Sequence, residues 1–290
     1  MSTGFVEADS VDQACRLLAD DPGGARIIGG GTGLMLMARM GLLSAATLVS
    51  LRRVDDPELR AVELRGGTLR IGGLCTLTQV RDHPLVRRAL PAMASLLYRL
   101  SSVRTRNVAT IAGCVAHGDP HMDLPPLLIA LDAVVAVAGP GGRRQIPCGD
   151  FFLGYYEVAL GAGDVVTGIE VPVPAPGTFV AYRKFTGALA EDWPVAGVAL
   201  RLRLDGGRAA DAAVAVGAIE AVARRLPEVE RALAATVARE LDAEAIGELA
   251  AAGVEPLSDH LGTAWYKRKV LAAETARGLR SWMRGADGGQ

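Results

Sequence analysis

A run of glycines near the start of the chain is the feature that most constrains its fold. Gly29–Gly33 holds four glycines in five positions, between an apolar, strand-like segment, Ala25–Ile28, and a helix-like LMLMARM segment that ends at Gly41. Glycine lets the backbone turn sharply and lets N–H groups approach an anion at the positive end of a helix. The run predicts a strand-to-helix turn, which is either a tight turn alone or an anion-binding loop. It is neither a Walker A loop nor a GxGxxG motif.

Around this loop the chain carries alternating strand and helix signals. Ser10–Gln13 has the pattern of a capping box before an amphipathic helix, and Gly66-Gly67 separates two alternating segments as in a hairpin. Further along we expect one helix over Leu85–Leu100, a loop over 101–120, a helix over Leu124–Leu131, and strands over Ala133–Ala138 and Val165–Val171.

A proline-rich segment predicts the main domain boundary. Pro172–Gly177 contains three prolines in six residues, which is typical of a stiff, extended linker. Beyond it, three strand segments (179–185, 195–204 and 209–219) precede three helical ones (about 227–236, 242–251 and 263–283), and this order is typical of an α+β domain. The predicted domains are residues 1–175 and 178–285.

Composition argues against several classes of protein. The 290 residues carry 31 basic and 32 acidic side chains, whereas nucleic-acid-binding domains usually have a basic surplus. The most apolar stretch, Leu124–Ala138, is interrupted by Pro125, Pro126 and Asp132, so we expect no membrane span. The N-terminal MSTGFVEADS is acidic, where a signal peptide is basic and then apolar. We therefore expect a cytoplasmic protein.

The reactive residue types form no known catalytic motif. The four cysteines lie far apart with no CxxC, which argues against a zinc ribbon, an iron–sulfur cluster or a disulfide framework on this chain. No GxSxG or HExxH motif is present. We therefore expect no catalytic side chain, and in an enzyme of this kind a cofactor carries the chemistry.

A second segment, Thr110–Pro125 (TIAGCVAHGDPHMDLP), is rich in small and then polar residues. Small residues let a backbone pass close to a ligand. Asp123 precedes an apolar helix, so its carboxylate either caps that helix or accepts from a ligand hydroxyl group. Side chains two apart share a face only in an extended segment, and Gly118 and Pro120 favour a loop. We therefore expect no metal site at His117, Asp119, His121 and Asp123.

Lysine is scarce. Only three of the 31 basic residues are lysines, namely Lys184, Lys267 and Lys269. In a chain that uses arginine for most cations, a remaining lysine marks a position that needs a compact ammonium group. This argument singles out Lys184, which stands alone in the first 266 residues.

Two segments together resemble the FAD-binding medium subunits of molybdenum hydroxylases, which include the flavoprotein subunits of aerobic carbon monoxide dehydrogenase and of bacterial xanthine dehydrogenase-type enzymes. Arg26–Met40 is similar to the family pattern AGGxSLLPxMKL, and Thr110–Pro125 is similar to TIGGNxAHADPxxDLP. Shorter matches extend the resemblance, in order, over essentially the whole chain. They are Arg104–Asn107, Asp150–Gly154, Ile169–Pro172, Tyr182–Phe185, Asp192–Pro194 and Tyr266–Arg268.

The resemblance implies a PCMH-type (vanillyl-alcohol-oxidase) fold. Two α+β subdomains, about 1–55 and 56–175, would hold FAD, and a C-terminal domain would combine a three-stranded antiparallel sheet with a helical bundle. By resemblance, Gly29–Leu34 and Thr110–Cys114 cradle the pyrophosphate, Asp123 binds the ribityl or ribose region, Lys184 lies near the flavin ring and Leu100 packs on the cofactor. The implied site residues are Gly29, Gly30, Gly31, Thr32, Gly33, Leu34, Leu100, Thr110, Ile111, Ala112, Gly113, Cys114, Asp123 and Lys184.

The chain departs from the family pattern at four of these positions. Ala112 replaces a glycine and Cys114 replaces an asparagine, and a thiol is a poor hydrogen-bonding substitute for an amide. Thr32 and Gly33 stand where the family often has His or Gln and then Ser. The thiol of Cys114 predicts weaker cofactor binding. We interpret the departures as tolerated variation, with a degenerate or substrate-specialised subunit as the alternative.

The function that the resemblance implies is electron transfer. A molybdopterin-binding large subunit would oxidise the substrate, a small subunit with 2Fe–2S clusters would carry the electrons, and this subunit would pass them through FAD to NAD, a quinone or oxygen. Two alternatives stay open: an FAD-less scaffold of the same fold, suggested by Ala112 and Cys114, and a stand-alone flavin oxidase, for which no base is found.

Overall fold

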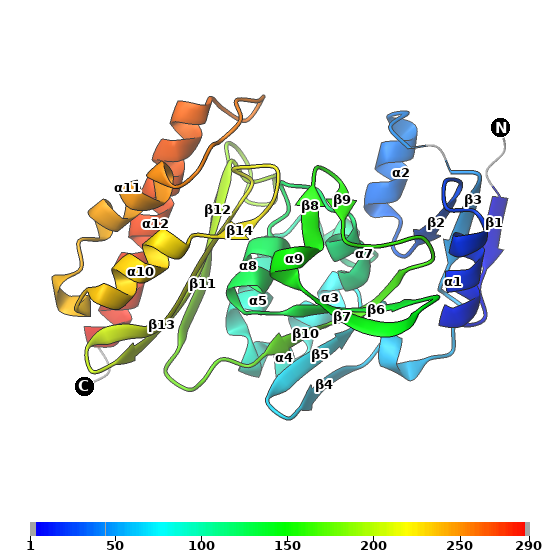
Figure 1. The fold of residues 1–290 in the computed structure, drawn as a ribbon, viewed down its shortest axis with the longest axis horizontal. Helices are drawn as coiled ribbons and strands as arrows, with labels where there is room; N and C mark the ends of the chain where they lie inside the picture. Colours follow the sequence, from blue (N-terminus) through cyan, green and yellow to red (C-terminus); the bar gives the residue numbers. More distant parts are fainter. Residues whose placement is uncertain (1–3, 44, 288–290) are drawn as a thin grey trace. The chain divides into compact units, whose positions relative to one another are not determined.

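The computed structural model describes residues 4–43 and 45–287, so the acidic N-terminal segment considered above begins outside the described residues. The chain forms two compact units, and neither is continuous in sequence. Figure 1 gives the element labels used below. Unit 1 comprises Met1–Ala89, Ser101–Gly118 and Ala133–Pro172; unit 2 comprises Leu90–Leu100, Asp119–Asp132 and Val173–Gln290.

Unit 1 contains two main sheets. The first is parallel, with β3 (Thr47–Ser50) between β1 (Gly4–Glu7) and β2 (Ala25–Ile28). Helix α1 (Val11–Asp20) connects β1 to β2, and the Ser10 hydroxyl accepts from the Gln13 N–H, which confirms the predicted cap. The second sheet is antiparallel, in the order β4 (Val62–Arg65), β5 (Thr68–Gly72), β10 (Val165–Pro172), β6 (Val134–Gly139) and β7 (Gly142–Pro147).

Strand β10 forms the centre of the second sheet, and its apolar side chains are buried. Helix α1 packs its apolar face into a core that also includes Ala138 and Val165 from this sheet. The remaining elements of unit 1 are short. They are α2 (Thr32–Arg39), η1 (Pro57–Leu59), α3 (Leu77–Asp82), α4 (Pro84–Ala89), α6 (Val103–Arg106), α7 (Ile111–Ala116), α9 (Cys148–Phe151), β8 (Phe152–Gly154) and β9 (Glu157–Val158).

Two sequence expectations were wrong in this region. The single helix expected over Leu85–Leu100 is two helices, α4 and α5 (Pro91–Arg99), because Leu90 leaves the helical conformation before a proline. The loop expected over 101–120 contains α6 and α7. Side-chain oxygens of Ser102 and Thr110 cap these short helices, and one or two turns give too little periodicity to be recognised.

Unit 2 is built on an antiparallel sheet in the order β11 (Phe179–Phe185), β12 (Ala196–Asp205), β13 (Arg208–Gly217) and β14 (Arg224–Arg225). The α+β class and the three long strands agree with the sequence analysis. The expected three-stranded sheet nevertheless has a fourth strand. β14 is only two arginines long, so it shows no alternation of apolar and polar residues by which a strand is recognised.

Helices cover both faces of this sheet (Figure 1). Val198, Leu200 and Leu202 of β12 point into the core shared with the C-terminal helices. The alternate residues face α8 (Leu124–Ala130), where a Cβ at Gly217 would lie 3.0 Å from Pro126, and Arg201 forms an ion pair with Asp132 just after α8. The helices on the first face are α10 (Pro227–Ala235), α11 (Ala243–Ala252) and α12 (Ala264–Asp287), with η2 (Ala238–Glu240) between the first two.

Among the described residues, no helix combines the length and the apolar character needed to cross a bilayer.

A buried glycine sets how closely α11 and α12 pack. A Cβ added at Gly247 would collide with the backbone carbonyl of Ala272. We expect Gly247→Ala to lower the free energy of unfolding by about 1–3 kcal/mol, because one helix must shift away from the other. Gly253→Ala is the matched control, since it meets its neighbours at ordinary contact distance with φ of −80°. Urea denaturation of both variants tests this, and equal midpoints would contradict it.

Candidate cofactor site

The glycine run forms the turn between β2 and α2. Gly31 is the N-cap of α2 and has φ of 71°, a left-handed conformation that favours glycine. Within the described part of the chain, the N–H groups of Thr32, Gly33 and Leu34 have no hydrogen-bond acceptor. Three successive N–H donors at the start of a helix are suited to an anion. This donor set fits a phosphate group.

Packing within unit 1 also explains the glycines. A Cβ at Gly29 would lie 2.8 Å from Thr110 Oγ1, and one at Gly30 would collide with the Val108 carbonyl. A Cβ at Gly33 would lie 2.9 Å from the His117 ring, which itself meets Tyr156 edge-on. The two sequence motifs therefore lie against each other. The tight turn and the anion-binding loop are compatible, because the same glycines serve close packing while α2 keeps free donors.

In the Thr110–Cys114 segment Thr110 is the N-cap of α7, and the four backbone N–H groups of the first turn that follows it are already paired. Ile111 donates to the Cys75 carbonyl (2.9 Å) and Ala112 to the Gly73 carbonyl (3.1 Å). Gly113 donates to Thr110 Oγ1 (3.2 Å), and Cys114 donates to the Thr110 carbonyl (2.9 Å). The anion donors of unit 1 thus lie at α2, whereas the Thr110 segment forms the surface against which the glycine run packs.

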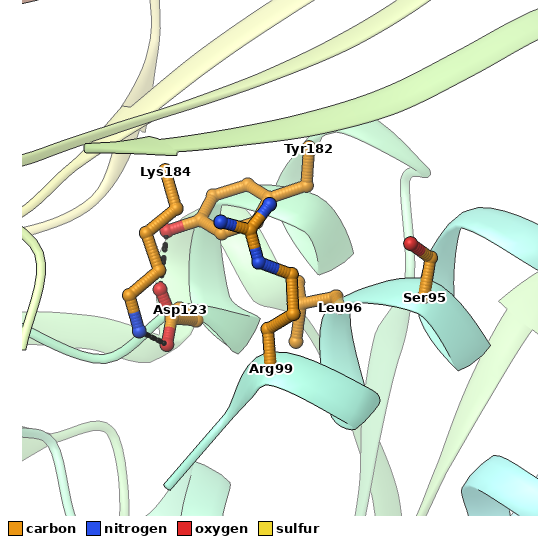
Figure 2. Close-up of a pocket in the computed structure, with 6 residues that line it drawn as sticks. All are labelled: Ser95, Leu96, Arg99, Asp123, Tyr182 and Lys184. Atoms are coloured by element: carbon orange, nitrogen blue, oxygen red, sulfur yellow. Dashed lines mark hydrogen bonds and ion pairs between the residues drawn. The ribbon is translucent and has the colours of Figure 1, made fainter. Parts of the chain in front are cut away.

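In unit 2 the structure brings Asp123 and Lys184 together (Figure 2). Asp123 Oδ2 accepts from Lys184 Nζ at 2.8 Å, and Asp123 Oδ1 accepts from Tyr182 Oη at 2.8 Å. Asp123 occupies the N-cap position of α8 but makes no capping hydrogen bond, so the capping interpretation was wrong. The remaining predicted residue of this unit, Leu100, is buried at the end of α5.

Strand alternation positions the two donors. Tyr182 and Lys184 are two residues apart on β11, so both side chains leave the same face of the sheet. Gly197 on β12 leaves room for the Tyr182 hydroxyl, which a Cβ at that position would strike. The sequence analysis did not include Tyr182 among the site residues. The spacing of Tyr182 and Lys184 on a strand was the signal that could have identified it.

Burial dominates the electrostatics of this group. Burial raises the pKa of Asp123, against the opposing effects of Lys184, Tyr182 and Arg99. Burial also raises the pKa of Tyr182 well above its ordinary value, and the Asp123 carboxylate adds to this shift. Tyr182 is therefore a neutral hydrogen-bond donor at every physiological pH. Lys184 has 4% of its side chain exposed, so its buried ammonium group depends on Asp123 for a compensating negative charge.

A small pocket opens beside this ion pair. Its cavity volume is about 30 Å³, enough for a water-sized group such as one hydroxyl or carbonyl oxygen. Arg99, on α5, adds a second cation to its wall (Figure 2). The lining residues are Ser95, Leu96, Arg99, Asp123, Tyr182 and Lys184.

The alternating His and Asp residues are divided between the two units. His117 belongs to unit 1, against Gly33 and Tyr156, whereas His121 belongs to unit 2, where its two ring nitrogens face different carboxylates. Over residues 4–43 and 45–287, no group of three or more His, Cys, Asp or Glu side chains is placed to hold a metal ion.

Comparison with known proteins assigns the chain to a family. Residues 1–174 match the FAD binding domain in molybdopterin dehydrogenase, and residues 180–282 match the CO dehydrogenase flavoprotein C-terminal domain. The medium chain of carbon monoxide dehydrogenase from Hydrogenophaga pseudoflava is 33% identical over 277 residues, covering 95% of each chain. The nicotine 6-hydroxylase medium subunit of Paenarthrobacter nicotinovorans is 31% identical over 267 residues, covering 92% of each.

The fold agrees with a solved structure. A chain of carbon monoxide dehydrogenase from Hydrogenophaga pseudoflava superposes with a TM-score of 0.91 at 31% identity, covering 97% of this chain and 96% of the other. The expected fold class is thereby confirmed, including the FAD-binding and C-terminal flavoprotein parts. From its first matched domain to its second, the chain belongs to the flavoprotein family of molybdopterin dehydrogenases, as an FAD-binding medium subunit.

Proposed function

We propose that this chain is the electron-transfer subunit of a cytoplasmic molybdenum-dependent hydroxylase. It would receive electrons from 2Fe–2S clusters on a small subunit and pass them to NAD, a quinone or oxygen, while a molybdopterin-binding large subunit oxidises the substrate. The observation that carries this proposal is the family match over both domains, joined to a free donor set at α2. All four cysteines are buried and none of them forms a disulfide bond, which suits a reducing compartment.

FAD, when bound, supplies the redox chemistry that the side chains of this subunit lack. The N–H groups of Thr32, Gly33 and Leu34 would donate to its pyrophosphate, and Gly29–Gly31 would keep the turn open enough for that approach. The Thr110–Cys114 segment would support this turn. In unit 2, Leu100 would supply an apolar contact.

Asp123 and Lys184 would bind the cofactor through one acceptor and one donor. A carboxylate has about four lone-pair directions, so Asp123 can accept from a ribityl or ribose hydroxyl as well as from Tyr182 and Lys184. The Lys184 ammonium group would place positive charge beside the flavin ring, where a cation stabilises the reduced, anionic form. Tyr182 would hold the carboxylate in place by a hydrogen bond that does not titrate in the physiological range.

The positions of Ala112 and Cys114 in the structure favour retention of FAD over the scaffold alternative. Both residues lie where the backbone N–H groups already have protein acceptors, so these substitutions leave the α2 donors unchanged. A stand-alone oxidase would need its own base, and Asp123 is already paired with a cation and a phenol. The relatives named above act on substrates as different as carbon monoxide and nicotine, so substrate choice is assigned to the large subunit.

The first prediction from this proposed function concerns the cofactor itself. We expect the purified full-length chain, alone or after addition of FAD, to show the two visible absorption bands of a flavin and to release FAD on denaturation. Absorption spectroscopy and chromatography of the released nucleotide measure this. A colourless chain that takes up no FAD, even with its large and small subunits present, would support the scaffold function. Purification without any partner subunit, together with turnover of an organic substrate, would support the oxidase.

The second prediction concerns Lys184. We expect Lys184→Met to weaken FAD binding by about 10-fold to 100-fold, since a charged hydrogen bond is lost. Lys184→Arg is not expected to restore affinity, because a planar guanidinium does not fit where a compact ammonium is buried. Fluorescence titration with FAD measures the Kd.

Two further variants separate binding from folding. Lys269→Met is the matched control, because Lys269 is half exposed and pairs only with Glu248 on the surface. The double variant Asp123→Asn/Lys184→Met removes both charges together, so no buried charge is left without a partner. We expect it to fold with a near-normal melting temperature and still bind FAD weakly. Normal FAD affinity in the double variant would show that the Asp123–Lys184 ion pair supports the fold and does not bind FAD.

A further inference from the structure

A second group of charged side chains, partly exposed, lies in unit 2 and centres on His121. Its Nδ1 is 3.4 Å from Asp119 Oδ1, and its Nε2 is 3.5 Å from Asp259 Oδ2. The imidazole also stacks on the indole of Trp193, with ring centroids 6.1 Å apart and planes at 24°. His121 thus meets three segments: its own loop before α8, the β11–β12 loop and the segment before α12.

The carboxylate of Asp259 is held by a buried lysine. Lys267 Nζ donates to Asp259 Oδ2 at 2.5 Å, and Lys267 is 1% exposed on the first turns of α12. Burial by itself would raise the pKa of Asp259, but hydrogen bonds from Lys267 and from the Leu261 N–H, with the nearby charges of Lys267 and His121, lower it. Asp259 is therefore ionised near neutral pH. The Asp119 carboxylate is buried, at 5% exposure, and its Oδ1 accepts from the backbone N–H of His121 at 2.9 Å.

The protonation state of the His121 imidazole decides how strongly it attracts the carboxylates of Asp119 and Asp259. Neutral histidine has one N–H donor and one lone pair, so it attracts a carboxylate on one side and presents a lone pair to the other. The imidazolium has an N–H on both nitrogens and a positive charge, so it attracts both. The groups that face it are Asp119 from its own loop and Asp259, backed by Lys267, from the α12 side; Trp193, on the third side, does not titrate.

We propose that His121 is a positioning residue: its protonated ring ties the Asp119–Asp123 segment and Trp193 to Asp259 at the start of α12, and loss of the proton loosens this tie. Both attached segments lead to the cofactor pocket. His121 is two residues before Asp123, and Trp193 lies on the loop that follows Lys184 and Phe185. The tie itself is independent of FAD, whereas its effect on FAD affinity rests on the proposed function.

Trp193 provides a direct signal for this state, because a protonated imidazole stacked on an indole quenches its fluorescence. The chain has three tryptophans, so the contribution of Trp193 is obtained by subtracting the emission of Trp193→Phe from that of the unmodified protein. We expect this difference to rise as the pH is raised from about 5 to about 8, because loss of the imidazole proton removes the quenching. In His121→Phe, which keeps a stacking ring without a proton, we expect the transition to be lost.

Two controls test whether the signal belongs to this cluster. His260→Asn changes an exposed histidine next to Asp259 and should leave the transition unchanged. Lys267→Met removes the other cation from Asp259, so the imidazolium is more strongly stabilised and the midpoint should move to higher pH. His121→Asn replaces His121→Phe if the latter does not fold. A flat Trp193 signal between about pH 5 and 8, or a transition that survives without His121, would overturn the proposal.

The positioning role has its own measurement, the Kd for FAD as a function of pH. We expect the Kd of the full-length chain to increase by about threefold to tenfold from pH ~6 to pH ~8, and to lose this dependence in His121→Phe. A pH-independent Kd in the unmodified protein would overturn the role at the pocket. A chain that binds no FAD at any pH would contradict the proposed function instead, and the fluorescence titration would still decide whether the tie exists.

Discussion

The close contact between α8 and the β11–β14 sheet is the constraint on which the Asp123 pocket depends. The sheet presents Gly217 to the helix, where a Cβ would lie 3.0 Å from Pro126, so this glycine lets the helix approach closely. All seven residues of α8 are buried, so moving the helix away would expose its leucines at about 1.5–3 kcal/mol each. Asp123 precedes the first residue of α8. The packing of this helix therefore decides where the carboxylate meets β11.

The buried Asp123–Lys184 ion pair is better explained by a role in ligand binding than by a contribution to the free energy of unfolding. Removing two charges from water costs several kcal/mol per ion, and apolar side chains of similar size often stabilise such a position equally well or better. Here Lys184 and Asp123 are both nearly inaccessible, and a buried tyrosine donates to the same carboxylate. An arrangement of this kind keeps an acceptor and a compact cation at fixed positions beside a small cavity. That is the requirement of a site for a polar ligand group, and it agrees with the proposed role in FAD binding.

The sequence predicted the long elements and missed what depends on distant contacts. The strands of unit 2 follow from alternation, and the scarcity of lysine marked Lys184, which proves to be buried; Lys267, also buried, shares that property, while Lys269 is exposed. Tyr182 was missed although its spacing from Lys184 placed both on one face. The capping prediction for Asp123 failed because the N2 and N3 positions of α8 are Pro125 and Pro126, which have no N–H to donate to the carboxylate. No local pattern connects His121 with Asp259, since only the folded chain brings the two segments together.

Two of the four departures from the family pattern, Ala112 and Cys114, lie outside the set of free anion donors. Ala112 and Cys114 lie in the first turn of α7, where the backbone N–H groups already bond to Gly73, Cys75 and Thr110. The free donors belong to α2, where Thr32 and Gly33 are the other two departures. A serine at position 33 would bring its Cβ to 2.9 Å from the His117 ring, whereas glycine lets the ring lie against the start of the helix. Gly33 and His117 thus pack against each other within unit 1, beside the turn that presents the donors.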